Sequence, residues 1–492
     1  MEQRRKNLTQ LFIPICLETL LYMLSGMVDT LMLSSVNDQA VGAVGTANTY
    51  IGIFIIMFSV ISSGMVAVMT QNIGAGRPGV AYQARQLGLA FNAVLGVIMS
   101  LFLSLGAGII LSGVGVADAL MQPAKTYLQI VGGFCILNAL IPICSSYLRA
   151  FGFSKEPLYA SIIGNVINFC LNAFFLFVLH KGVAGVATAT VISRIINLVI
   201  VVMLGAVLVK AKQHPERESN REVMGQIIRI GLPSACETAI YNVSMTLVIR
   251  FLNQMDAQGL NVTARSYTMQ ITNFSYCVGA ALAQANAIMT GWRIGAKEYD
   301  ACDRGTRKAA IIGVIVAVIL ETMFALCSGW IMQLFSKDPQ MVSLVGKLLA
   351  IDIVLEMGRV TNLVYGQALK TSGDAVFPVV MGACFMILCS VGGTYLFGIR
   401  LGLLAVGAYI GMAGDECVRA VGMYLAGRAE SGNKRDWLNP GSFVAPTGTT
   451  WKNQSVGGNR KTDLAGGDCT IGGAKHRAYH IGKNCRLQTG GI

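Results

Sequence analysis

The chain has 492 residues, of which 54% are hydrophobic and only 13% are charged, and its formal net charge is +13. A soluble globular protein carries roughly 25% charged residues, so this composition excludes that class and indicates a polytopic membrane protein. The positive charge is weak evidence for a nucleic-acid partner, because it comes mostly from connections between apolar segments and from a basic tail.

Twelve apolar runs are long enough to cross a hydrocarbon core of ~30 Å, which needs about 20 helical residues. We expect membrane-spanning helices at approximately 8–34, 42–70, 83–113, 123–148, 157–179, 183–209, 226–252, 264–291, 309–335, 341–369, 376–398 and 402–427. The polar segment 210–222 separates two halves of six spans. The sequence therefore predicts an all-α polytopic membrane protein with an N-terminal lobe at 1–215, a C-terminal lobe at 216–437 and a disordered, polar, basic tail at 438–492.

Basic residues gather in alternate connections and predict the orientation of the chain. One set of connections carries Arg4, Arg5, Lys6, Arg77, Arg85, Arg149, Lys155, Lys210, Lys212, Arg217, Arg221, Arg293, Lys297, Arg304, Arg307, Lys308 and Lys370. The other set carries only Lys125, Lys181, Arg265, Lys337 and Arg400. We expect a plasma (inner) membrane location with both termini and the central loop in the cytoplasm.

The two halves repeat one another in sequence. The motif P-x-x-x-E-T-x-x-Y occurs at 14–22 and again 219 residues later, and IGA occurs at 73–75 and again 221 residues later. LRAFGFSKEP (148–157) aligns with LKTSGDAVFP (369–378), also 221 residues later. Because the matches fall at same-side positions, they predict two six-helix lobes related by a parallel repeat. Transporters of this design rock two bundles around a site at their interface.

The first span carries polar side chains on one helical face. Its members are Glu18, Tyr22, Ser25 and Asp29. The second half repeats the first three as Glu237, Tyr241 and Ser244. Val248 replaces Asp29 there, so the deep aspartate belongs to the first half alone. A carboxylate facing lipid would cost several kcal/mol, so we expect this face to point into the bundle. We assign Glu18, Tyr22, Glu237 and Tyr241 to the substrate pathway, although the two glutamates lie near span ends and fit a capping or snorkelling role equally well.

Spans five and six add neutral oxygen ligands to the first half. Asn168 and Asn172 lie one helical turn apart, and Thr190 lies in the next span, while their repeat positions hold Cys389, Gly393 and Gly411. Carboxylate, amide and hydroxyl oxygens suit a hard cation such as Na⁺, and a carboxyl group in a low dielectric can instead hold a proton. We expect a coupling site for H⁺ or Na⁺ with no other cofactor and no metal. Interhelical hydrogen bonds, or a bond from Thr190 to its own helix, are the structural alternative.

Span ten carries a charged cluster that the first half lacks. Its members are Asp352, Glu356, Arg359 and Asn362, and their repeat positions hold Val131, Cys135, Asn138 and Ile141. The spacing places the first three on one face. We assign the cluster to the substrate pathway, with a structural pairing of Glu356 and Arg359 as an equal alternative.

These motifs together resemble the multidrug and toxic compound extrusion (MATE) family of cation-coupled exporters. The resemblance covers about residues 8–437 and rests on MVDTLML (27–33), QNIGAGRPGVAYQAR (71–85), LRAFGFSKEP, NVINFCLN (165–172), GVAGVATAT (182–190) and LKTSGDAVFP. It implies two six-helix lobes, alternating access, and a first-lobe cation site at Asp29, Asn168, Asn172 and Thr190. The family often has an aspartate where this chain has Asn172, and that difference favours H⁺ over Na⁺ here.

We therefore expect a cation-coupled antiporter, not an enzyme, that exports amphipathic or cationic organic compounds. Its partners are a small-molecule substrate and membrane lipid, with no nucleic acid, and the oligomeric state stays open. A flippase for lipid-linked oligosaccharides is the alternative transporter, but it would need more basic residues than the exceptions Arg194 and Arg359 among the deep charges. A membrane-embedded enzyme is the alternative from another class, and the chain has no HExxH, GxGD or GxSxG motif. In the tail, the spacing of Cys469, His476, His480 and Cys485 matches no usual zinc finger.

Overall fold

The computed structural model describes residues 6–34, 38–113, 116, 118–209, 216–255, 259–333 and 335–432. Those residues form helices joined by short connections, and no strand occurs among them. The predicted tail at 438–492, with its cysteines and histidines, lies outside the described residues.

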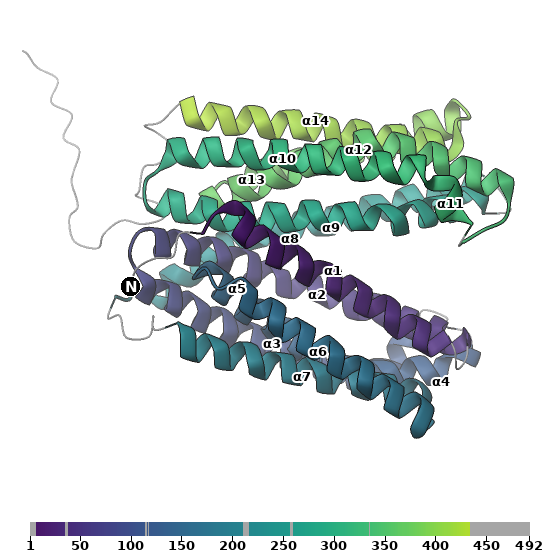
Figure 1. Cartoon of the computed structure of the whole chain (residues 1–492), viewed down its shortest axis with the longest axis horizontal. Coiled ribbons are helices and arrows are strands. Elements are labelled where there is room, and N and C mark those ends of the chain that lie inside the picture. Colours follow the sequence, from purple (N-terminus) through teal and green to yellow (C-terminus); the bar gives the residue numbers. More distant parts are fainter. Residues whose placement is uncertain are drawn as a thin grey trace, which may run out of the picture. The chain divides into compact units, whose positions relative to one another are not determined.

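The first half of the chain forms an N-terminal helical bundle (Figure 1), and its helices include five candidate membrane spans and one bent pair. Its helices are α1 (Leu8–Ser34), α2 (Asp38–Gly74), α3 (Pro78–Gly113), α4 (Asp118–Tyr127), α5 (Ile136–Ala150), α6 (Lys155–Ala173) and α7 (Gly182–Leu208). The π-helical turns η1 (Leu128–Gly132) and η2 (Phe174–Val178) continue α4 and α6. The fourth span is therefore bent, by 43° between Leu120–Gly132 and Ile136–Ala150.

The second half forms a C-terminal bundle that is likewise built from helices (Figure 1). Its helices are α8 (Asn220–Met255), α9 (Leu260–Gly295), α10 (Tyr299–Leu326), α11 (Ser328–Met332), α12 (Pro339–Ser372), α13 (Val376–Phe385) and α14 (Leu404–Gly432). The short α11 lies between two spans, and α13 continues through η4 (Met386–Val391) and η5 (Thr394–Arg400) as one span. The all-helical fold with two six-helix lobes is thus confirmed.

Seven of the described helices are long and apolar enough to cross a membrane by length and composition alone, or eight if the bent pair counts as one span. The other four predicted spans correspond to α8, α9, α12 and α14, all in the C-terminal bundle. In α12 and α14, the buried charges described below lower the hydropathy. Most helices also extend past the predicted spans: α2 begins at Asp38 and α9 ends at Gly295, since polar helix ends continue into the interface.

The two bundles are joined at the end where α2, α5, α9 and α12 terminate. The indole Nε1 of Trp292 in α9 donates a hydrogen bond of 2.8 Å to the carbonyl oxygen of Ala150 in α5. The amide Nε2 of Gln71 in α2 donates one of 2.5 Å to the carbonyl oxygen of Thr371 in α12. Trp292 and Thr371 lie 221 positions after Gln71 and Ala150, so these two bonds are one contact repeated by the internal symmetry.

Glycines let the helices of the two bundles approach closely at this junction. A Cβ atom on Gly74 would overlap the backbone oxygen of Trp292, and one on Gly295 would overlap the backbone oxygen of Gln71. These two glycines are also 221 residues apart. Small residues at helix crossings permit such backbone contact in a membrane, where packing drives association.

A hydrophobic cluster covers the same junction. It unites Ile61 and Met65 of α2 with Ile227 of α8 and Ile288 of α9. At the opposite end, which carries α4 and α11, the ribbons of the two bundles lie apart (Figure 1). The junction formed by Gln71, Ala150, Trp292 and Thr371 is called the closed end below.

Candidate functional site

Three of the predicted cation-site residues meet in the N-terminal bundle. The amide Nδ2 of Asn172 in α6 donates a hydrogen bond of 2.6 Å to Oδ1 of Asp29 in α1. The same amide donates a second bond, of 3.2 Å, to Oδ1 of Asn168 one turn earlier. Asn172 is fully buried, and its own Oδ1 has no hydrogen-bond partner among the described residues. The Oδ1 atom of Asn172 is therefore a buried oxygen beside the Asp29 carboxylate that can accept a hydrogen bond or ligate a cation.

The fourth predicted residue, Thr190, is buried in α7. Its hydroxyl donates a hydrogen bond of 2.9 Å to the carbonyl oxygen of Val186, one turn earlier in the same helix. This is the local bonding that threonine commonly adopts in helices. Thr190 therefore lies on a neighbouring helix without being hydrogen-bonded to Asp29 in the described chain.

The sequence analysis did not place two neighbours of Asp29. Arg194, one turn after Thr190 on α7, is close enough to act electrostatically on the Asp29 carboxylate. Tyr127 at the end of α4 interacts with both charges and hydrogen-bonds with Asn48 of α2. The four-residue spacing between Thr190 and Arg194 was the signal that could have identified the arginine.

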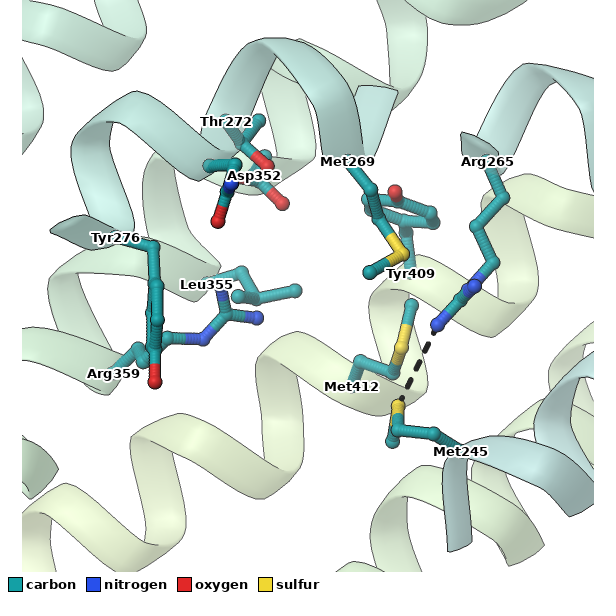
Figure 2. Close-up of a pocket in the computed structure, with 11 residues that line it drawn as sticks. Met245, Arg265, Met269, Thr272, Tyr276, Asp352, Leu355, Arg359, Tyr409 and Met412 are labelled. Carbon is teal, nitrogen blue, oxygen red and sulfur yellow. Dashed lines mark hydrogen bonds between the residues drawn. The ribbon is translucent and has the colours of Figure 1, made fainter. Parts of the chain in front are cut away.

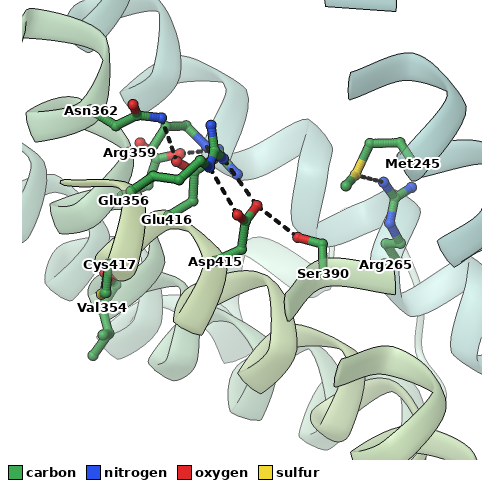
Figure 3. Close-up of polar contacts among 11 residues, drawn as sticks. Met245, Arg265, Val354, Glu356, Arg359, Asn362, Ser390, Asp415, Glu416 and Cys417 are labelled. Atoms are coloured by element: carbon green, nitrogen blue, oxygen red, sulfur yellow. Dashed lines mark hydrogen bonds and ion pairs between the residues drawn. The ribbon is translucent and has the colours of Figure 1, made fainter. Parts of the chain in front are cut away.

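The C-terminal bundle holds a buried ionic network between α12 and α14 (Figure 3). Glu356 and Arg359 form an ion pair, which confirms the pairing that their spacing allowed. Arg359 Nε also lies 3.5 Å from Oε1 of Glu416, and Nδ2 of Asn362 donates to Oε2 of Glu416 at 3.1 Å. Arg359 and Asn362 thus share Glu416, a residue that the sequence analysis did not select.

Helix α14 supplies the rest of the network. Arg419 contacts Asp415 through two bonds of 2.9 and 3.0 Å and lies 2.9 Å from Glu416. The hydroxyl of Ser390 in η4 donates a bond of 2.9 Å to Asp415 (Figure 3). Arg419 is 3% exposed, so this pairing is internal. The sequence signal was the run DECVR in the last span, which places opposite charges three and four residues apart.

Two further carboxyl groups lie near this network. Glu321 of α10 and Asp352 of α12 are 0% and 2% exposed. Neither oxygen of Glu321, nor Oδ2 of Asp352, has a hydrogen-bond partner among the described residues, although Glu321 lies beside Ser275. Glu321, Asp352 and Glu356 interact electrostatically, so the lobe gathers three buried carboxyl groups at one place.

A cavity of about 110 Å³ opens between α8, α9, α12 and α14 (Figure 2). Asp352 and Arg359 line it, together with Arg265, Tyr276 and Tyr409. Of the other predicted pathway residues in this lobe, Glu356 and Asn362 belong to the ionic network behind the cavity. Tyr241 interacts electrostatically with Tyr276 at the cavity wall.

The remaining predicted pathway residues lie elsewhere. Tyr22 is 68% exposed on α1. Glu18 forms an ion pair of 2.6 Å with Arg149, and Glu237 forms one with Lys370. Lys370 lies 221 residues after Arg149, so these pairs are again repeat equivalents, and Arg149 also donates to Gln284 of α9 at 3.3 Å. Both pairs therefore lie beside the closed end.

The MatE family model matches the chain twice, at residues 14–174 and 233–396. The two matches begin 219 residues apart, the spacing of the first repeated motif. An uncharacterized transporter, YisQ of Bacillus subtilis strain 168, is 33% identical over 87% of this chain and 94% of its own length. A probable multidrug resistance protein, NorM of Thermotoga maritima, is 24% identical over 85% of this chain and 90% of its own length.

Solved structures share the fold. A crystal structure of MATE in the bent conformation matches with a TM-score of 0.80 at 19% identity, covering 87% of this chain and 96% of that one. An outward-facing conformation of a multidrug resistance MATE family transporter matches with a TM-score of 0.78 at 18% identity, with the same two coverages.

Proposed function

The chain belongs to the MATE family of membrane transporters, and on that premise we propose that it is a cation-coupled antiporter that exports amphipathic or cationic organic compounds by alternating access. The lobes at 1–215 and 216–437 are the units that move. The coupling ion is H⁺ or Na⁺, and the neutral Asn172 beside Asp29 favours H⁺.

The observation that carries this proposal is the hydrogen-bonded group of Asp29, Asn172 and Asn168. A carboxylate within a membrane helix is stable only when a proton, a cation or a partner neutralises it. Asn172 supplies a neutral donor, and Arg194 supplies a positive charge that is not bonded to Asp29. Binding and release of a cation then change the net charge of this group and favour different conformations.

The C-terminal cavity is the proposed place of substrate contact. Tyr276 and Tyr409 offer aromatic surface, while Asp352 offers a carboxyl group whose Oδ2 has no hydrogen-bond partner among the described residues. Behind the cavity, Glu416 of α14 contacts Arg359 and Asn362 of α12 and so holds the two helices together. A rigid wall behind a ligand site keeps its polar groups in place.

The proposed orientation places the closed end in the cytoplasm. The connections at that end carry Arg77, Lys155 and Lys297. The contacts of Gln71 and Trp292 then close the cytoplasmic side, which corresponds to an outward-facing state. The chain would reside in the plasma (inner) membrane with cytoplasmic termini.

Purified protein in sealed proteoliposomes tests the function. We expect ethidium to move against its own gradient when a pH gradient is imposed across the membrane, and to stop when a protonophore collapses that gradient. A Na⁺ gradient at equal pH on both sides is expected to give much slower movement. Equal ethidium rates with and without either ion gradient would reject coupled antiport.

A further inference from the structure

One buried arginine in the C-terminal cavity has no acidic partner among the residues that the structure describes. Three arginines in the described chain are more than nine-tenths buried, namely Arg149, Arg265 and Arg419. Arg149 is paired with Glu18, and Arg419 is paired with Asp415 and Glu416. Arg265 is 6% exposed, and its hydrogen bond goes to the sulfur of Met245 at 3.7 Å. Its Nε has no partner among the described residues.

The apolar pattern of the sequence predicts a different position for Arg265. Arg265 lies at the edge of the predicted span 264–291, and this position predicts that it belongs to a connection. The structure places it inside α9, which begins at Leu260, with its guanidinium directed into the cavity (Figure 2). Its repeat position is Val44, so the charge is not part of the scaffold that the two lobes share.

A guanidinium stays charged in proteins, and a buried charge is costly unless it is neutralised. A thioether sulfur is only a weak acceptor and carries no compensating charge. Arg359, on the other side of the same cavity, already has Glu356 and Glu416 (Figure 3). Arg265 is therefore the guanidinium in this cavity whose bonding capacity is open to a ligand.

The other residues that line the cavity indicate which kind of ligand fits beside Arg265. Met245, Met269 and Met412 surround the guanidinium of Arg265 with polarizable apolar surface (Figure 2). Tyr409 interacts with both Arg265 and Asp352 and adds an aromatic ring. A volume of about 110 Å³ holds a carboxylate and part of a ring, so it fits one end of a larger molecule.

We propose that Arg265 is a specificity-determining residue that binds the anionic group of an amphipathic organic substrate, such as an aromatic carboxylate, with the three methionines contacting its apolar part. This inference rests on the proposed export function and specifies an anionic group on the amphipathic compounds among its substrates. A planar guanidinium recognises a carboxylate through two parallel hydrogen bonds, which gives geometric selectivity as well as affinity.

Binding of a matched pair of probes to the purified protein in zwitterionic lipid nanodiscs tests the proposal. Dansylglycine carries a carboxylate, while dansylglycinamide has the same ring without that charge, and zwitterionic lipid keeps anionic headgroups out of the comparison. We expect wild type to bind the acid at least roughly ten-fold more tightly, as a charge-assisted hydrogen bond would provide. Arg265→Gln is expected to bring the ratio close to one, and Arg265→Lys to keep part of the preference.

Arg250→Gln is the matched control, because Arg250 lies on the exposed side of α8 and does not line the cavity. It is expected to keep the wild-type ratio. A wild-type ratio near one overturns the proposal without any variant, and so does an Arg265→Gln variant that weakens both probes equally. Ethidium export in the proteoliposome assay is scored separately, so a failure of antiport is distinguished from a failure of anion recognition.

Discussion

At the scale of single residues, the contact between Asp29 and Asn172 determines which ion the N-terminal site can hold. The amide donates to the carboxylate at 2.6 Å, so one negative charge is present where two would attract a metal cation more strongly. We predict that Asn172→Asp raises the Na⁺ dependence of export several-fold, because Asp29 and the new carboxylate would share a cation. Rates in proteoliposomes with and without a Na⁺ gradient measure this, with Asn165→Asp on the same helix as the control. Identical Na⁺ responses in both variants would contradict the prediction.

Two substitutions in the ionic network of the C-terminal bundle are expected to differ in their effect on stability. Glu356→Gln leaves Arg359 with Glu416, so we expect near-normal folded yield but altered binding at the cavity that Arg359 lines. Arg419→Met leaves Asp415 and Glu416 without their shared cation, which typically costs about 3–5 kcal/mol when a buried pair is broken. Thermal unfolding and monodispersity of detergent-purified protein compare the two. An Arg419→Met variant as stable as Glu356→Gln would remove the structural role of that pairing.

Sequence reasoning predicted part of these sites and missed part for a physical reason. The grouping of Asp29 with Asn168 and Asn172 followed from an isolated charge in an apolar run and from one-turn spacing, both of which are local. The sequence does not predict Glu416 and Glu321 as site residues, because their role depends on which other helix they face. Arg265 was assigned to a connection because the apolar pattern locates a span only to within a few residues, and one turn decides whether a side chain is buried.

At the scale of helices, the closed end depends on backbone contact between α2 and α9. In this contact, Gly74 and Gly295 are the positions where an added Cβ would meet the backbone of the opposite bundle, as Gly64 and Gly231 are where α2 contacts α8. The internal repeat predicted that these segments correspond, but not that they touch one another. Their contact requires the arrangement of the two bundles, which no local pattern contains.

We predict that Gly74→Ala shifts the protein away from the state closed at this end. Gly45→Ala is the matched control, since Gly45 lies in the same helix and a Cβ there meets no neighbouring atom. Distances between spin labels on the connections that follow α2 and α9 measure the shift. A wider distribution in Gly74→Ala than in Gly45→Ala is the expected result, whereas matching distributions would show that the glycine contact does not hold the end closed.

At the scale of the whole molecule, the bias of basic residues predicts which end faces the cytoplasm. Arg265 lies in the cavity and not in a connection, so one of the five basic residues counted at the less basic end no longer belongs there. The difference in charge between the two ends is therefore larger than the sequence indicates. In a background without cysteines, we expect Leu401→Cys to react with an impermeant maleimide added to intact cells, and Ser219→Cys to react only after lysis. Both positions are exposed in the structure. The reverse pattern of labelling would invert the proposed topology.

In the proposed mechanism, Asp29 is the group that couples ion movement to export. The most direct measurement is pH-gradient-driven ethidium transport by Asp29→Asn and wild type in proteoliposomes at matched protein content. Asparagine keeps the size of the side chain and a hydrogen-bonding oxygen near Asn172 but removes the charge that a proton would neutralise. We expect Asp29→Asn to fold and insert normally while gradient-driven transport falls to the level of protein-free liposomes. Wild-type rates for Asp29→Asn under the same gradient would contradict the account.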